Sequence, residues 1–138
     1  MEKIKFKNAL ALLERKFSTG NYESHYIFES LSILQKECVL KMINYYEQEN
    51  QLDILKSNPN ALFEDYLMAP ADFYKKTFSH NIMVLTELED VRKENYSKIR
   101  DIVVDFLNKN KIVVLISTDS FDKSLIIPES FFNEFIFC

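Results

Sequence analysis

Residues Ile112-Val113-Val114-Leu115-Ile116 are the most strand-like stretch of the sequence, and the expected fold is built outward from them. The run is short, entirely apolar and rich in β-branched side chains, which predicts a buried strand. Turn-forming residues follow over 117–122, and a second apolar run, 125–127, ends at Pro128. We therefore expect the two runs to pair as a C-terminal β-hairpin.

Helical periodicity dominates the rest of the chain. Apolar residues spaced three and four apart predict a helix over 8–18 and a longer one over 21–49, with Asn21 as its candidate N-cap. The longer helix is apolar on nearly all sides, so we expect it at the centre of the fold with Leu34 and Cys38 buried. Cys138 is then the exposed thiol.

Three further segments complete the expected helices. Proline and asparagine positions predict short helices over 60–67 and 70–79, and apolar spacing predicts a second long helix over 81–110. In an alternative interpretation, Thr86 and Glu89 form a capping box, so the helix begins at residue 87 and residues 82–85 form a strand. Residues 3–7 alternate between apolar and lysine side chains, which is compatible with either a strand or a helix.

Together these elements predict an α+β fold. We expect a mainly helical bundle of two long and two or three short helices with a small C-terminal β-hairpin. The length predicts a single domain over residues 1–138, large enough to bury a core without metal or disulfide.

The composition excludes several classes of ligand-binding site. The single glycine, Gly20, rules out the glycine-rich loops that bring backbone amides close to phosphates. The first residues lack an apolar signal core, and no run approaches the ~18 apolar residues of a membrane span. With only two cysteines, the chain is expected in the reducing cytoplasm and away from membranes.

Residues that could carry catalysis or bind metal are scattered. His25, Cys38, His80 and Cys138 each stand alone, which does not match the paired spacing of zinc ligands. No sequence motif combines a nucleophile with a base and an orienting group. We therefore expect no metal, no cofactor and no enzymatic activity.

Charge is distributed unevenly along this acidic chain of net charge −4. Residues 20–74 hold nine acidic and three basic side chains. Arg92, Tyr96 and Arg100 form a basic stripe on the expected second long helix, but carboxylates interrupt it, so nucleic acid is not an expected partner.

Aromatic rings among the carboxylates predict a surface for a basic protein partner, because charge speeds encounter and rings bury area. The candidate partner-binding residues are Tyr45, Tyr46, Glu47, Glu49, Asp53, Glu64, Asp65, Tyr66 and Asp72.

By size and charge the chain resembles small cytosolic inhibitors such as immunity proteins and antitoxins, which implies a protein-binding function that masks a basic partner. One alternative is a small enzyme or nucleic-acid-associated factor whose site is dispersed through the fold. Another is an oligomerising structural or regulatory domain, since homo-oligomers are compatible with the aromatic C-terminal segment.

Overall fold

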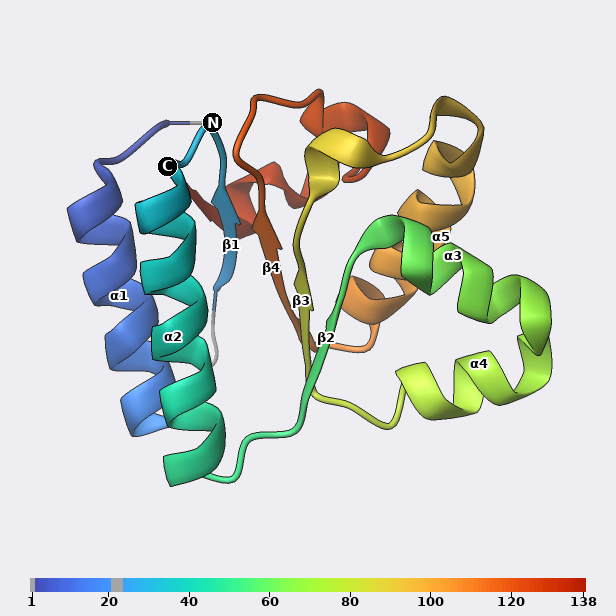
Figure 1. Ribbon diagram of the computed structural model, residues 1–138, viewed down its shortest axis with the longest axis horizontal. Helices are drawn as coiled ribbons and strands as arrows, with labels where there is room; N and C mark the ends of the chain where they lie inside the picture. Colours follow the sequence, from blue (N-terminus) through green and yellow to red (C-terminus); the bar gives the residue numbers. More distant parts are fainter. Residues whose placement is uncertain (1, 21–23) are drawn as a thin grey trace.

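The core of the molecule is a parallel sheet (Figure 1). The computed structural model describes residues 2–20 and 24–138, and within them the sheet has five strands in the order β2-β3-β4-β1-β5. Every pair of neighbours is parallel. The strands are β1 (His25–Phe28), β2 (Ile54–Ser57), β3 (Ile82–Leu85), β4 (Ile112–Ile116) and β5 (Phe135–Phe137).

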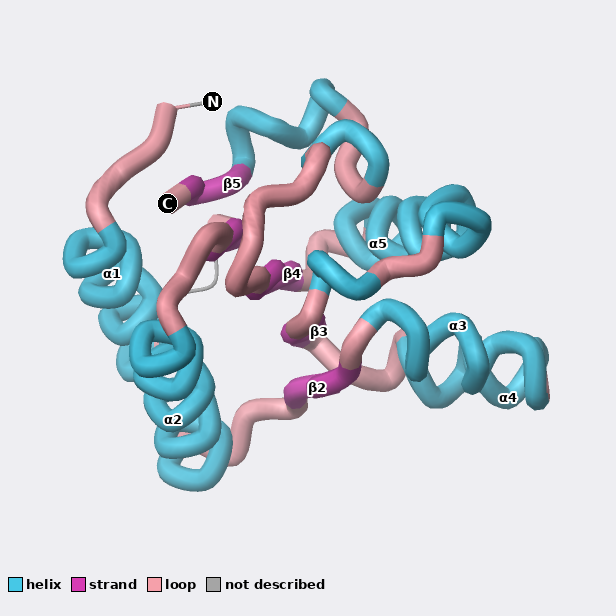
Figure 2. The backbone as a smooth tube through the Cα atoms, turned by 45° about the horizontal axis from the view of Figure 1, so that its top comes forward, coloured by secondary structure: helices cyan, strands magenta, loops and turns pink. Residues whose placement is uncertain are grey.

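Helices cover both faces of this sheet, as Figures 1 and 2 show. On one face, α1 (Phe6–Thr19) and α2 (Ile33–Glu49) pack over a core that includes Phe17, Phe28 and Ile43. The opposite face carries α3 (Pro59–Met68), α4 (Pro70–Thr77) and α5 (Tyr96–Asn108). Two apolar cores therefore flank the sheet, which makes the fold a three-layer α/β arrangement.

Local sequence explains where several helices begin. Ser32 and Gln35 form a capping box at the start of α2, with each side chain accepting a hydrogen bond from the other residue's backbone N–H. The Asn58 side chain accepts from the backbone N–H of Ala61, and Pro59 occupies the first turn of α3. Because the Ser32 cap starts α2 at Ile33, this helix begins shortly after β1 ends at Phe28.

The expected α+β bundle with a C-terminal hairpin is wrong, because the protein has an α/β parallel sheet. Residues 25–28 were expected inside a long helix but form β1, buried along its whole length between two layers of helices. A fully buried strand is a continuous apolar run and cannot be told from a buried helix by periodicity. The proposed cap Asn21 lies outside the described residues.

The two halves of the expected hairpin do not pair. Residues 112–116 do form a strand, β4, but its neighbours are β1 and β3. Residues 123–125 form a 3₁₀ turn, and the last strand is β5, parallel to β1. Likewise 82–85 is strand β3, so the continuous helix over 81–110 is wrong and the strand of the alternative interpretation is right. The capping box of that alternative is wrong, because a 3₁₀ turn without a side-chain cap spans Leu88–Asp90 and the helix α5 begins only at Tyr96.

The structure also reverses the expected burial on α2. Leu34 is 77% exposed and Cys38 is exposed, because the helix packs on the sheet through Val39 and Ile43. Cys138 is buried instead, and that burial raises the pKa of its thiol to about 11. Of the helices within the described residues, none is long and apolar enough to cross a membrane.

Candidate functional site

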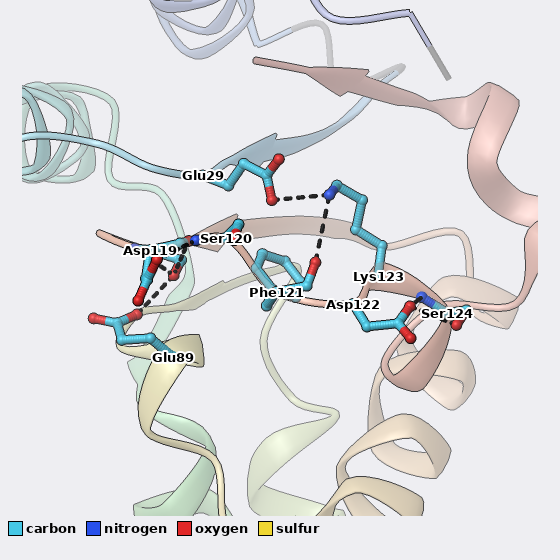
Figure 3. Close-up of polar contacts among 9 residues, drawn as sticks. Glu29, Glu89, Asp119, Ser120, Phe121, Asp122, Lys123 and Ser124 are labelled. Atoms are coloured by element: carbon cyan, nitrogen blue, oxygen red, sulfur yellow. Dashed lines mark hydrogen bonds and ion pairs between the residues drawn. The ribbon is translucent and has the colours of Figure 1, made fainter.

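The direction of the chain reverses between β1 and β4, and we call the place where these two strands end at their carboxyl side the crevice. From β1 the chain crosses through α2 to the edge strand β2, whereas from β4 it turns the other way and reaches β5 beyond β1. Parallel sheets bind ligands at such a point, outside the carboxyl ends of the strands. The crevice cluster, as we call it, consists of Glu29, Glu89, Ser117, Thr118 and Lys123. Figure 3 labels Glu29, Glu89 and Lys123 among them.

A buried ion pair closes the crevice. Glu29 follows β1 directly and its side chain is 8% exposed, while Lys123 comes from the connection between β4 and β5. The Lys123 Nζ lies 2.8 Å from Glu29 Oε2 (Figure 3). The same ammonium group stands over the rings of Phe121 and Phe137, at 5.4 and 4.5 Å from their centroids. The pair thereby holds the β4–β5 connection against the end of β1.

A second carboxylate, Glu89, accepts hydrogen bonds from two hydroxyl groups. Ser117 Oγ donates to one of its oxygens and Thr118 Oγ1 to the other, both at 2.8 Å. Burial raises the pKa of Glu89, but the hydrogen bonds from these hydroxyls and from backbone groups outweigh it, so the net shift is downward. Glu89 is therefore a charged acceptor that takes both hydroxyl donors at the end of β4.

The backbone amides of the loop after β1 donate within the chain. The N–H groups of Glu29, Ser30 and Leu31 donate to the carbonyl oxygens of Cys138, Asp119 and Ser117, at 3.0, 3.3 and 3.2 Å. Phosphate binding at the same place uses free amides of a loop and of the helix behind it. A nucleotide phosphate therefore does not fit the residues of this crevice.

The expected partner-binding residues do not form one surface. Four of them lie on α2, which covers one face of the sheet, and four lie on α3 and α4, which cover the other. Asp53 precedes β2 and contacts His80 at 2.6 Å. Glu47 is 2.6 Å from Lys56. The α2 members are Tyr45, Tyr46, Glu47 and Glu49, and the others are Glu64, Asp65, Tyr66 and Asp72.

A different surface carries cations that have no carboxylate partner among the described residues. Tyr74 and Phe78, on and just after α4, stack with their ring planes 9° apart and their centroids 5.7 Å apart. Lys98 donates to Tyr74 Oη at 2.8 Å, and Lys109 stands 5.2 Å from the Phe78 centroid. We use the name α4/α5 cationic surface for the two rings and four nearby cations. Its residues are Tyr74, Phe78, Lys98, Arg100, Lys109 and Lys111.

None of its four cations is ion-paired within the part of the chain that the structure describes. A hollow of about 450 Å³ lies beside Tyr74, Lys98 and Arg100 and is also lined by Asp101 and Asp105. Arg100 and Tyr96 do lie on α5, whereas Arg92 precedes that helix, so the basic stripe expected there is incomplete.

Comparison with known proteins places the fold. No protein-family model matches the chain, and no curated protein matches it in sequence. Among solved structures, domain III of the replication initiation protein DnaA from Thermotoga maritima superposes with a TM-score of 0.71 at 14% identity. That match covers 95% of this chain and 60% of the other.

A structure described as a DNA replication initiation factor also has a TM-score of 0.71 and 14% identity, over 98% of this chain and 46% of the other. The fold is that of the DnaA domain. The chain thus spans less than two thirds of either protein.

These neighbours overturn the expected function. An immunity- or antitoxin-like inhibitor that masks a basic partner was inferred from size and charge, and the fold is instead similar to that of replication initiation proteins. The same finding conflicts with the expectation that nucleic acid is not a partner. The nucleic-acid-associated alternative agrees better with the structure.

Sequence reasoning missed the crevice cluster because its members are far apart along the chain. Glu29 and Lys123 are separated by 94 positions, and Glu89 and Ser117 by 28. One signal was present: polar residues directly follow the apolar runs that end at Phe28 and Ile116. In a parallel sheet such residues meet at one edge.

Proposed function

We propose that this chain is a non-enzymatic, cytoplasmic, nucleic-acid-associated factor that binds single-stranded DNA in the context of replication initiation. The observation that carries the proposal is the α4/α5 cationic surface, where Lys98, Arg100, Lys109 and Lys111 lack carboxylate partners in the described chain and lie near the half-buried rings of Tyr74 and Phe78. The DnaA-like fold supports it.

The chemistry of this surface suits a single strand. Lysine and arginine neutralise backbone phosphates, and aromatic rings stack on bases that a duplex would keep hidden. Tyr74 and Phe78 are half-buried, so part of each ring is open to a ligand. The acidic net charge of −4 weakens attraction at long range, so binding is expected to depend on local contacts and low salt.

Fluorescence anisotropy with a labelled single-stranded oligonucleotide of mixed sequence tests the proposal. We expect binding that is stronger than to the matching duplex, and an affinity that falls linearly with salt on a log–log plot, with slope about −2 to −3 for four cations. Absence of binding at low salt would contradict the proposal.

Charge reversal distinguishes this surface from general attraction. The double variant Arg100→Glu and Lys109→Glu should weaken binding by about tenfold or more. Lys7→Glu with Arg15→Glu makes the same charge change on exposed positions of α1, across the sheet, and should cost much less. Equal losses from the two double variants would place the DNA elsewhere.

A further inference from the structure

The crevice at the carboxyl ends of β1 and β4 is where this architecture binds phosphate-bearing ligands. Three features bind a phosphate there: amides of a flexible loop, the amino end of the following helix, and a cation. In this chain each of these features has a partner of its own, and the partners belong to the chain itself.

The amides are engaged first. Glu29, Ser30 and Leu31 donate their N–H groups to backbone carbonyls. The amino end of α2 is capped by Ser32, whose Oγ accepts from the backbone N–H of Gln35 at 3.1 Å. Ile33, in the first turn of α2, is an apolar residue that is 72% exposed.

The cation is engaged as well. Lys123 Nζ is 2.8 Å from the Glu29 carboxylate, and the Lys123 side chain is 19% exposed. The Glu89 carboxylate accepts both nearby hydroxyls, from Ser117 and Thr118. An incoming phosphate would have to displace the Glu29 carboxylate from Lys123 and approach the Glu89 carboxylate, while the amides of Glu29, Ser30 and Leu31 already donate to backbone carbonyls.

We infer that the chain closes its own ligand crevice, with the Glu29 carboxylate occupying on Lys123 the place of a phosphate oxygen. The protein therefore does not bind nucleoside triphosphates or diphosphates at this point of the sheet. Glu29 and Lys123 act as an internal substitute for a bound ligand, so the β4–β5 connection stays fixed whatever the nucleotide concentration.

Thermal unfolding with and without tripolyphosphate or Mg²⁺–ATP tests this inference. All proteins carry Arg100→Glu and Lys109→Glu, so that the proposed DNA surface cannot contribute an anion site. The parent should keep its unfolding midpoint within about 1 °C at about 5 mM of either compound, since a ligand stabilises only a state that it binds. A saturable rise of the parent's midpoint would overturn the inference.

Removing the Glu29 charge should open the site. Glu29→Gln is expected to lower the midpoint by about 5 °C and then to gain about 2 °C or more with tripolyphosphate, because Lys123 is left without its carboxylate. Glu134→Gln makes the same charge change at an exposed position and should respond like the parent. Equal responses of the two variants would overturn the inference.

The double change Glu29→Gln with Lys123→Met separates the site from any general loosening of the fold. If Lys123 is the anion-binding group, the double variant should fold and show no gain with tripolyphosphate. A gain as large as that of Glu29→Gln alone would overturn the inference. This outcome leaves the proposed DNA surface untouched, because DNA binding is measured on other residues.

Discussion

The crevice cluster and the α4/α5 cationic surface use the same kinds of side chain in opposite ways. In the crevice, Lys123 is paired with Glu29, and the Glu89 carboxylate accepts two hydroxyl donors. On the cationic surface, Lys98 and Lys109 contact aromatic rings and, within the described residues, have no carboxylate partner. The two regions therefore differ in what partners their cations: a carboxylate in the crevice, and aromatic rings on the cationic surface.

The largest expected difference between the two regions concerns a single lysine. Lys123→Met leaves the Glu29 carboxylate buried without a cation, and we expect a loss of about 3 kcal/mol in the free energy of unfolding. Lys109→Met on the cationic surface should cost less than about 0.5 kcal/mol. Denaturant titration of both variants measures the contrast, and similar losses would remove it.

The next prediction concerns His25, the buried histidine at the amino end of β1, and the dependence of stability on pH. His25 Nδ1 accepts from the Val113 N–H at 3.1 Å, and burial lowers the pKa of His25 to about 4, from 6.5. Between pH 6.5 and about 4, the unfolded chain therefore binds a proton at His25 that the native state does not bind. The free energy of unfolding falls as the pH drops through this range. We expect a loss of about 2 kcal/mol between pH 7.5 and pH 5.

The variant His25→Leu should lack this part of the pH dependence even if its stability at neutral pH is lower. His80→Gln, which removes the other histidine, should keep the acid slope of the parent protein. A slope that survives in His25→Leu would assign the effect to other groups.

A smaller effect is expected where the crevice loses one donor. Ser117→Ala removes a hydrogen bond to Glu89 and a contact to the backbone N–H of Asp119, which should cost about 1 to 2 kcal/mol. The pKa of Glu89 should also rise, since a donor to its charged form is gone. The Ser124 hydroxyl donates a hydrogen bond to the exposed Asp122. Ser124→Ala should therefore change the free energy of unfolding by less than about 0.5 kcal/mol. Equal losses of stability in Ser117→Ala and Ser124→Ala would show that the hydrogen bonds of the crevice cluster stabilise the fold no more than an exposed hydrogen bond does.

The smallest effect should be a gain. Tyr26 is 1% exposed, and its hydroxyl has no hydrogen-bond partner among the described residues. Tyr26→Phe removes this buried polar atom and keeps the ring that stacks on Phe28, so we expect about 1 kcal/mol of added stability. Thermal unfolding measures it, and a loss would mean that the hydroxyl has a partner in solution.

Segments whose structure depends on local signals were predictable. The expected helices at 8–18, 60–67 and 70–79 lie within or almost within α1, α3 and α4, and the apolar run 112–116 is β4. Their periodicity, caps and prolines act within a few residues. A β-branched run such as 112–116 also has few alternatives to a buried strand.

Strands β1, β2 and β5 were not predictable because their partners are remote, whereas a strand at 82–85 was at least one of the two interpretations of that segment. Nothing near 25–28 shows that Tyr26 pairs with Val114 on one side and Ile136 on the other. For the same reason the crevice cluster escaped notice, since Glu29 meets Lys123 only after the sheet has formed. The polar residues that follow the apolar runs are the one sequence signal that could have predicted that these side chains lie close together.

The position of β1 has a consequence for how the protein folds as it is synthesised. Both neighbours of this inner strand, β4 and β5, come from the last part of the chain, so the middle of the sheet stays empty while the first half emerges. Until then α1 and α2 expose apolar faces with no sheet to cover. Such non-local topologies fold slowly and pass through aggregation-prone states. We therefore expect the nascent chain to require protection by chaperones until β4 is complete.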